Sequence, residues 1–479
     1  MSTTRHSDET ERTRVPTRVN SSDNLGAQQK ESGLETILSR VPNETQQYSR
    51  SVDLEKDTEN AGDADSNDQT DDEMNPDHIN PDEKDPNLIV WDGPNDPENP
   101  MNWSYGRKWL YTVVLGSTTF CVTFASSVFS TATVVTAEIF NVSLEVMTLG
   151  TSLFVLGFAL GPLFWGPMSE LFGRKKPLFL GFFIFAIFQI ATAVSQNVQS
   201  IMLTRFFGGA FASAPLAIIG GTLVDFFSPV DRGVATVIFA GATFVGPIAG
   251  PIVGGFIVQS YLGWRWTAYI TAIMAFFFGT VAFIIVPESQ HPTILQARAK
   301  KIRYATKNWA IHSKADENEV DLKHIARTYL LRPFEMIIKE PILLLISVYL
   351  GLVYGILYLF FEAYPISFQE VRGWNGGVGA LPFIGIMIGV IFGGITIAFV
   401  TKTRFARKFK KHGRVIPEER LPPMIAGAFI LPIGLFWFAW TSNPNITWVP
   451  QVIAGIPTGM GKLHRFHYYY LSTIANSLC

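Results

Sequence analysis

The chain has 479 residues, of which 48% are hydrophobic and only 16% are charged, and its formal net charge is −2. That value hides two unlike regions: residues 1–100 carry 24 acidic and 9 basic residues, whereas residues 101–479 have a net charge of +13. The acidic region is polar and lacks apolar clusters, which predicts a disordered tail. With only two cysteines, Cys121 and Cys479, the sequence offers no basis for a disulfide framework or a cysteine metal site.

Long apolar runs follow the tail. A bilayer core of ~30 Å needs about 20 apolar residues per helix, and this criterion predicts spans at 109–130, 146–168, 177–196, 201–223, 234–258 and 265–286. After a polar stretch at 287–340, further spans are expected at 341–364, 378–400 and 422–441, with a weaker run at 446–460. We therefore expect an all-α, polytopic membrane helical bundle made of two parts joined by a linker: a six-helix half at 101–286, the linker at 287–340 and an incomplete second half at 341–479.

Loop charge predicts the orientation. The turn at 173–176, the linker and the loop at 402–420 are basic and fall on one side of the membrane if the spans alternate. The loops at 131–145, 196–200 and 259–263, on the other side, contain no Lys or Arg. Because Lys and Arg accumulate in short cytoplasmic loops, we expect the N-terminal tail and the linker to be cytoplasmic. The expected location is a membrane crossed many times, with the plasma membrane favoured.

Two motifs carry a family resemblance. The turn after the second span, with Gly166, Glu170, Gly173, Arg174 and Lys175 in register, resembles the major facilitator superfamily signature G-x-L-a-D-r-x-G-R-K, with Glu170 in place of Asp. The fifth span matches the antiporter signature G-x-x-x-G-P-x-x-G-G at every fixed position, which here are Gly246, Gly250, Pro251, Gly254 and Gly255.

A third motif is incomplete. Arg205 and Gly209 resemble the fourth-helix signature R-x-x-Q-G, but Gly208 stands where Gln is usual. Over residues 95–460 the chain resembles the fungal twelve-helix drug:proton antiporters of this superfamily, which implies a bundle of the major facilitator type.

The resemblance also implies roles for these motifs. Glu170, Arg174 and Lys175, flanked by Gly166 and Gly173, would form an inner gate; the alternative is a topology signal on a solvated turn. The glycines at 246, 250 and 254 allow close helix packing, and Pro251 weakens the backbone hydrogen-bond ladder. In the resembled antiporters this helix restricts leak.

Charged and polar residues within spans are candidates for a substrate or proton pathway, because a charge at mid-membrane is costly. The resemblance gives Arg205 a part in proton coupling, with snorkelling to the interface as the alternative. Tyr354, Tyr358 and Glu362 recur every four residues and share a helix face, which indicates a cavity wall with Glu362 as proton acceptor or cation partner. A tyrosine belt with an interfacial carboxylate is the alternative. Gln189 in the third span is a weaker candidate.

The end of the chain departs from the family pattern. After residue 461 the sequence contains Lys462, His464, Arg465 and His467 and stays polar, where a relative would continue into two more helices. We interpret this as a C-terminally truncated member with a premature or frame-shifted end, in preference to metal binding by these residues.

The functional prediction follows from what the sequence contains. It has no phosphate-binding Gly-Lys-Ser/Thr loop, nucleophile elbow or paired metal ligands, so we expect neither an enzyme nor a bound cofactor or metal. By resemblance the chain is a proton-coupled exporter of small organic compounds. Its expected partners are the lipid bilayer, a small-molecule substrate and protons, with no nucleic acid, and it is expected to be a monomer. The alternatives are a metabolite uniporter or symporter, and a non-transporting truncated relic or regulatory partner.

Overall fold

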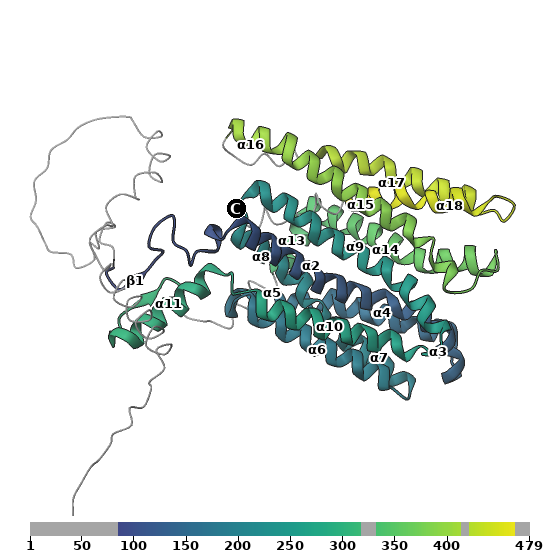
Figure 1. The fold of residues 1–479 in the computed structure, drawn as a ribbon, viewed down its shortest axis with the longest axis horizontal. Helices are drawn as coiled ribbons and strands as arrows, with labels where there is room; N and C mark the ends of the chain where they lie inside the picture. The colour runs from purple at the N-terminus through teal and green to yellow at the C-terminus, as the bar shows by residue number, and fades with distance from the viewer. Residues whose placement is uncertain (1–84, 318–331, 413–420, 465–479) are drawn as a thin grey trace, which may run out of the picture. The chain divides into compact units, whose positions relative to one another are not determined.

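A computed structural model describes residues 85–317, 332–412 and 421–464. In these ranges nine helical segments are long and apolar enough to cross a membrane. They correspond one to one with the nine predicted spans, and they run over Tyr105–Phe140, Leu144–Phe172, Lys175–Val194, Val198–Phe226, Pro229–Gln259, Arg265–Ile285, Leu343–Glu370, Val378–Lys411 and Pro422–Thr441. The all-helical architecture predicted from hydropathy is therefore confirmed (Figure 1).

Several spans of the first half consist of two helices. The elements in chain order are α2 (Tyr105–Val128), η3 (Phe129–Ala132), α3 (Thr133–Phe140), α4 (Leu144–Leu160), α5 (Pro162–Phe172), α6 (Lys175–Val194), α7 (Val198–Ala212), α8 (Ala214–Phe226), α9 (Pro229–Gln259) and α10 (Arg265–Ile285). Pro162 and Pro215 lie in the first turn of α5 and α8. Proline has no backbone N–H to donate to the carbonyl four residues earlier, and its ring clashes with that carbonyl, which explains the breaks at these points.

Two spans of the second half also consist of more than one helical element. Its elements are α13 (Arg332–Lys339), α14 (Pro341–Tyr364), the π-helix η5 (Pro365–Glu370), η6 (Val378–Ala380), α15 (Phe383–Val400), the π-helix η7 (Thr401–Phe405), α16 (Ala406–His412), α17 (Leu421–Thr441) and α18 (Trp448–Ile453). The weaker apolar run is helical too, since α18 is followed by a turn at Ala454 and by helical residues 455–464. Residues 465–479, which include Arg465 and His467, lie outside the described residues.

Lys462 and His464 are buried in this last helical stretch. The part of the chain that the structure describes contains no group of three or more His, Cys, Asp or Glu side chains that could hold a metal ion. Lys462 Nζ instead lies 4.6 Å from the centre of the Phe360 ring.

The long helix α9 joins the two halves. It packs against α2 on one side and α15 on the other (Figure 1). Its residues Val237, Ala240, Phe244 and Ile248 belong to a hydrophobic core formed otherwise by residues of the second half. Because α9 packs against α2 of its own half and against α15 of the other, the contact between the halves runs along this helix.

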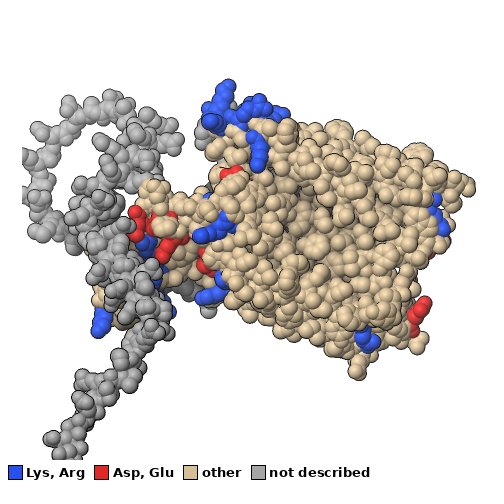
Figure 2. Space-filling model, in the orientation of Figure 1, with Lys and Arg blue, Asp and Glu red and all other residues tan. Residues whose placement is uncertain are grey.

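Basic side chains gather at one end of the helices. Figure 2 shows Lys and Arg concentrated at the end of the molecule where α16 lies in Figure 1, with few at the opposite end. The turn at Gly173 and the α11 helix (His291–Thr306) lie beyond span ends that precede them. We call the end formed by residues 173–176, 287–317 and 401–411 the basic end.

Part of the segment assigned to the disordered tail is ordered. Leu88–Ile89 form β1, which pairs in parallel with β2 (His312–Ser313), and η2 (Pro100–Asn102) follows. The pairing partner is more than 200 residues away, so composition alone did not reveal it. Residues 1–84 lie outside the described residues.

Candidate functional site

The glycines of the fifth-span motif form the contact between α9 and α2. A Cβ atom at Gly246 would collide with Thr123 Oγ1, and one at Gly250 would collide with Ser127 Oγ. At Gly254 a Cβ would lie 2.5 Å from Thr131 Oγ1. These three positions therefore require glycine because the backbones approach too closely for any side chain. Pro251, beside Gly250, is buried in the same continuous helix.

The last glycine of the motif has a different neighbour. A Cβ at Gly255 would lie 2.6 Å from the carbonyl oxygen of Gly376, in the loop before η6. Next to it, the Gly377 N–H donates to Gln259 Oε1 over 3.2 Å. The motif thus contacts α2 within the first half and the second half at the end opposite the basic end.

Arg205 lies in the interior of the first half, with only 1% of the residue exposed. Its guanidinium donates to the carbonyl oxygens of Gly150 (3.0 Å), Ala125 (3.0 Å) and Ser126 (3.3 Å), so that it bridges α4 and α2. The Phe154 ring centre is 4.3 Å from Cζ. No described carboxylate pairs with it. The Arg205 guanidinium is therefore enclosed by carbonyl groups and aromatic rings of the first half.

The second half reaches this arginine through Tyr358. The Tyr358 hydroxyl donates to Ser126 Oγ over 2.9 Å, and the Ser126 carbonyl is one of the acceptors of Arg205. One turn earlier on α14, the Tyr354 ring stacks on Phe244 with 5.4 Å between ring centres. The predicted tyrosine face of α14 is therefore the face that meets α2 and α9, and we call Arg205, Ser126 and Tyr358 the central chain.

Glu362 and Gln189 complete the predicted pathway residues, and they differ in burial. Glu362, one turn beyond Tyr358, is exposed and forms no ion pair with a described residue. Gln189 on α6 is 1% exposed, and its Nε2 has no hydrogen-bond partner among the described residues. A Cβ at Gly208 would lie 3.6 Å from this Nε2. The amide therefore sits beside the position where the family motif usually has glutamine.

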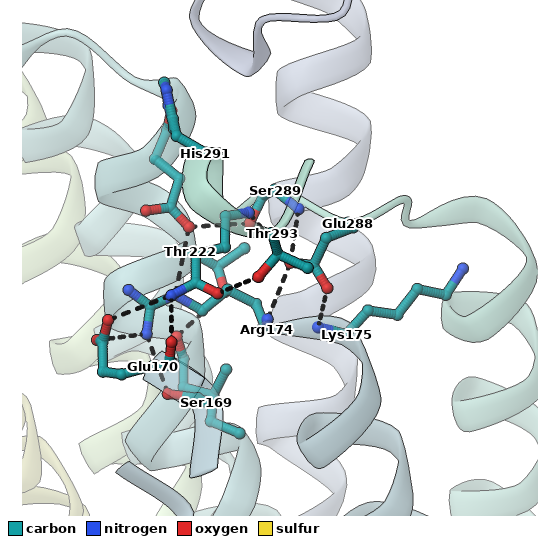
Figure 3. Close-up of polar contacts among 12 residues, drawn as sticks. Ser169, Glu170, Arg174, Lys175, Thr222, Glu288, Ser289, His291 and Thr293 are labelled. Atoms are coloured by element: carbon teal, nitrogen blue, oxygen red, sulfur yellow. Dashed lines mark hydrogen bonds and ion pairs between the residues drawn. The ribbon is translucent and has the colours of Figure 1, made fainter. Parts of the chain in front are cut away.

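The second polar cluster lies at the basic end, around Arg174 (Figure 3). Its guanidinium pairs with Glu170 at 2.7 Å and with Asp225, at the end of α8, at 3.3 Å. Ser169 Oγ accepts a further bond over 3.0 Å. Burial disfavours the charged form, but the carboxylates of Asp225 and Glu170 outweigh it and raise the pKa of Arg174 above its ordinary value. Two of the residues expected at the inner gate, Glu170 and Arg174, thus form an ion pair.

Glu288 connects the N-termini of two helices in this cluster. Its carboxylate accepts from the backbone N–H groups of Arg174 (2.8 Å) and Lys175 (3.0 Å) at the start of α6. It also accepts from the N–H groups of Ser289 and Gln290, just before α11, each over 3.0 Å. Helix N-termini leave unpaired N–H groups and favour negative charge, so one carboxylate satisfies both ends.

The remaining predicted gate residues contribute unequally. Gly173 has φ +88°, a left-handed conformation that favours glycine, and it brings the backbone against Glu288. A Cβ at Gly166 would meet nothing within 4 Å, so no close approach requires glycine there. Lys175 Nζ lies 4.9 Å from the Phe283 ring centre, and its side chain points away from the carboxylates (Figure 3). Lys175 thus joins the cluster through its backbone only.

Sequence reasoning missed Asp225 and the contact made by Glu288. Both are separated from Arg174 by long stretches of chain, 51 and 114 residues. The available signals were an acid in the last turn of the fourth span and the Pro287-Glu-Ser289 sequence directly after the sixth. Each of these marks a span end at the basic end, where the helices converge.

The chain is similar in sequence to known membrane transporters. The Major Facilitator Superfamily profile matches residues 115–469. The chain is 56% identical over 377 residues to the citrinin biosynthesis cluster MFS transporter mrr1 of Monascus ruber, covering 78% of this chain and 75% of that protein. It is 53% identical over 378 residues to the ascochitine biosynthesis cluster MFS transporter of Didymella fabae (79% and 73%).

Further matches extend to a more distant relative and to solved structures. The cercosporin MFS transporter CTB4 of Cercospora nicotianae is 44% identical over 392 residues, covering 81% of this chain and 76% of that protein. The fold matches the proton:xylose symporter XylE bound to 6-bromo-6-deoxy-D-glucose with a TM-score of 0.57 at 16% identity, covering 78% of this chain and 82% of that one. The chain is a multi-pass membrane transporter, not an enzyme, and it belongs to the major facilitator superfamily.

Proposed function

We propose that this transporter exports small organic compounds of the fungal secondary-metabolite class in exchange for protons. The relatives from Monascus ruber and Didymella fabae are named as transporters of the citrinin and ascochitine biosynthesis clusters. The glycine motif between α9 and α2 supports antiport, because it is complete in sequence and each of its close approaches is realised in the fold. The membrane is proposed to be the plasma membrane, with the basic end and the N-terminus in the cytoplasm and the chain acting as a monomer.

The observation that carries the proposal is the central chain of Arg205, Ser126 and Tyr358. A buried guanidinium without a carboxylate partner is costly in the interior of a membrane protein, yet this one is held by three carbonyl groups and linked to the other half by a tyrosine hydroxyl. In this proposal the hydrogen bond from Tyr358 to Ser126 breaks when the two halves move apart, and this changes the environment of the Arg205 guanidinium. Movement of the halves is thereby coupled to the electrostatics of the transport path.

The other polar residues take roles around the central chain. Glu362 is the proposed proton acceptor, since its carboxylate is exposed on the face of α14 that carries Tyr354 and Tyr358. Tyr354, Tyr358 and Gln189 line the substrate path in this proposal. The Arg174 cluster acts as the inner gate, whose ion pairs with Glu170 and Asp225 must open during transport.

Inside-out vesicles containing the full chain test the direction and the coupling of transport. Citrinin, ascochitine and cercosporin serve as labelled probes, and the lumen is made acidic. An exporter coupled to protons accumulates a probe in the lumen, and a protonophore abolishes the accumulation. A uniporter would only equilibrate the probe, a proton symporter would expel it from the lumen, and a non-transporting relic would leave every probe unmoved.

A matched pair of variants tests the assignment of the proton acceptor. Glu362→Gln should lose the stimulation by the pH gradient while retaining exchange of the probe at equal pH. Glu370→Gln serves as control, because Glu370 is also exposed and lies two turns further along the same helical segment. Equal loss of stimulation in both variants would contradict a specific role for Glu362.

A further inference from the structure

The segment that precedes the first span folds against the linker. We call residues 85–103 the strap. Its β1 pairs with β2, where the His312 N–H donates to the carbonyl oxygen of Asn87 over 3.0 Å. At its other end the Trp103 ring lies 5.8 Å from the ring of Phe226, the last residue of α8. The strap therefore contacts the linker at one end and the first half at the other.

Arg298 of α11 anchors the middle of the strap. Its guanidinium pairs with Asp92, with Asp96 (2.8 Å) and with Glu98 (3.8 Å). The Asp96 side chain is only 2% exposed and also accepts from the N–H groups of Asp92 (3.0 Å) and Glu98 (2.8 Å). One helical cation thus gathers three carboxylates from one short segment, an arrangement with little solvent screening at Asp96.

This anchor stays charged at physiological pH. Burial raises the pKa of the Asp96 carboxyl, but the two backbone N–H groups and the Arg298 guanidinium outweigh it and hold the pKa below its ordinary value. Because the folded-state pKa is depressed, the stabilisation is present above the ordinary carboxyl pKa and is lost only as pH falls through the lower value. The ion pair between Arg298 and Asp96 is therefore kept throughout the physiological pH range, and we call it the clamp.

The strap is connected to the Arg174 cluster through His291, the first residue of α11. The strap's Trp91 packs edge-on against His291, with 5.7 Å between ring centres. His291 Nε2 is 2.9 Å from the carbonyl oxygen of Asp225, and Ser289 Oγ donates to Asp225 Oδ2 over 3.0 Å. Ser289, just before α11, and His291, its first residue, therefore both contact Asp225, the partner of Arg174, and the strap packs against His291.

We propose that Arg298 and Asp96 are positioning residues for the gate: by clamping the strap to α11 they hold Glu288, Ser289 and His291 against Arg174 and Asp225. The proposal rests on the proposed function only in that it calls the Arg174 cluster a gate. It makes the strap, α11 and the first half one mechanical unit. Opening of the gate then requires either release of α11 or separation of Arg174 from Asp225 with α11 in place.

Hydrogen exchange of the purified full chain tests the proposal without a substrate. The N–H groups of Arg174 and Lys175 are bonded to Glu288 and should exchange slowly. In Arg298→Met the clamp is lost, and exchange at these two amides should rise about tenfold because local opening becomes easier. Arg303→Met is the matched control, since Arg303 lies on the same helix and pairs with Asp316 at 2.7 Å but forms no ion pair with a described residue of the strap.

A second variant keeps the test meaningful if Arg298→Met folds poorly. Asp92→Asn with Glu98→Gln removes two of the three carboxylates and leaves the buried turn at Asp96 intact, and it should give a smaller increase at the same amides. Faster exchange confined to residues 85–103, with Arg174 and Lys175 unchanged, would overturn the proposal. Failure of the vesicle experiment would not affect this result, because exchange reports the gate and not transport.

Discussion

At the scale of single residues, Gln189 shows how burial separates a structural from a functional role. A buried amide without a partner costs free energy that a fold has no reason to retain for stability alone. A Cβ at Gly208 would lie 3.6 Å from Gln189 Nε2, so the amide that α6 supplies lies directly beside this glycine. We interpret Gln189 as taking the position of the glutamine that the fourth-helix motif lacks.

The substitution Gln189→Leu tests this interpretation. Leucine has a similar volume and needs no hydrogen bond, so the free energy of unfolding should stay unchanged or rise by up to about 1 kcal/mol. Transport of the probes should fall strongly, because the donor facing the path is lost. Thermal unfolding in detergent measures the first quantity and vesicle uptake the second. Loss of stability together with transport would indicate a purely structural residue.

At the scale of elements, the spacing of glycines along α9 determines how closely α2 approaches. Gly246, Gly250 and Gly254 face α2, whereas Gly241 on the same helix has nothing within 4 Å of an added Cβ. The helix therefore contains both constrained and unconstrained glycines. They respond differently to the same substitution, since alanine has the higher helix propensity.

Alanine substitutions in α9 should have opposite effects on stability. Gly250→Ala places a Cβ on Ser127 Oγ and should lower the free energy of unfolding by about 1–3 kcal/mol through overpacking. Gly241→Ala meets open space and should raise it by up to about 1 kcal/mol. Thermal unfolding of both variants provides the comparison. Equal effects of the two changes would mean that α9 and α2 are not held together by close backbone contact.

The elements were predictable to different degrees. Membrane spans such as α9 and α15 followed from hydropathy, because a bilayer requires long apolar runs and nothing else in this chain has them. Composition alone places residues 85–100 of the strap in a disordered tail. Their order depends on Arg298, about 200 residues away, and on two-residue strands that no periodicity reveals. The motif residues were identified by type, but their partners Asp225 and Glu288 became evident only once the span ends were brought together.

At the scale of the whole transporter, α9 contacts the second half near both of its ends. At the basic end a Cβ at Gly233 would lie 2.9 Å from the methyl carbon of Thr401, at the start of η7. At the other end Gln259 accepts from the Gly377 N–H. Alternating access needs each of these contacts to separate in turn. A covalent bond across one of them should then stop the cycle.

A cysteine pair across the basic end makes this a direct experiment. In a background with Cys121→Ala and Cys479→Ser, the variant Gly233→Cys with Thr401→Cys should form a disulfide on oxidation, because the two side chains come within bonding reach. Transport should be abolished and then restored by reduction. The control pair is Thr192→Cys on α6 with Thr204→Cys on α7; the two threonine hydroxyls are 3.1 Å apart and both lie in the first half. This pair should oxidise without blocking transport. Continued transport by the oxidised Gly233–Thr401 pair would show that the halves do not part along this side of α9, and the movement would have to be sought elsewhere between them.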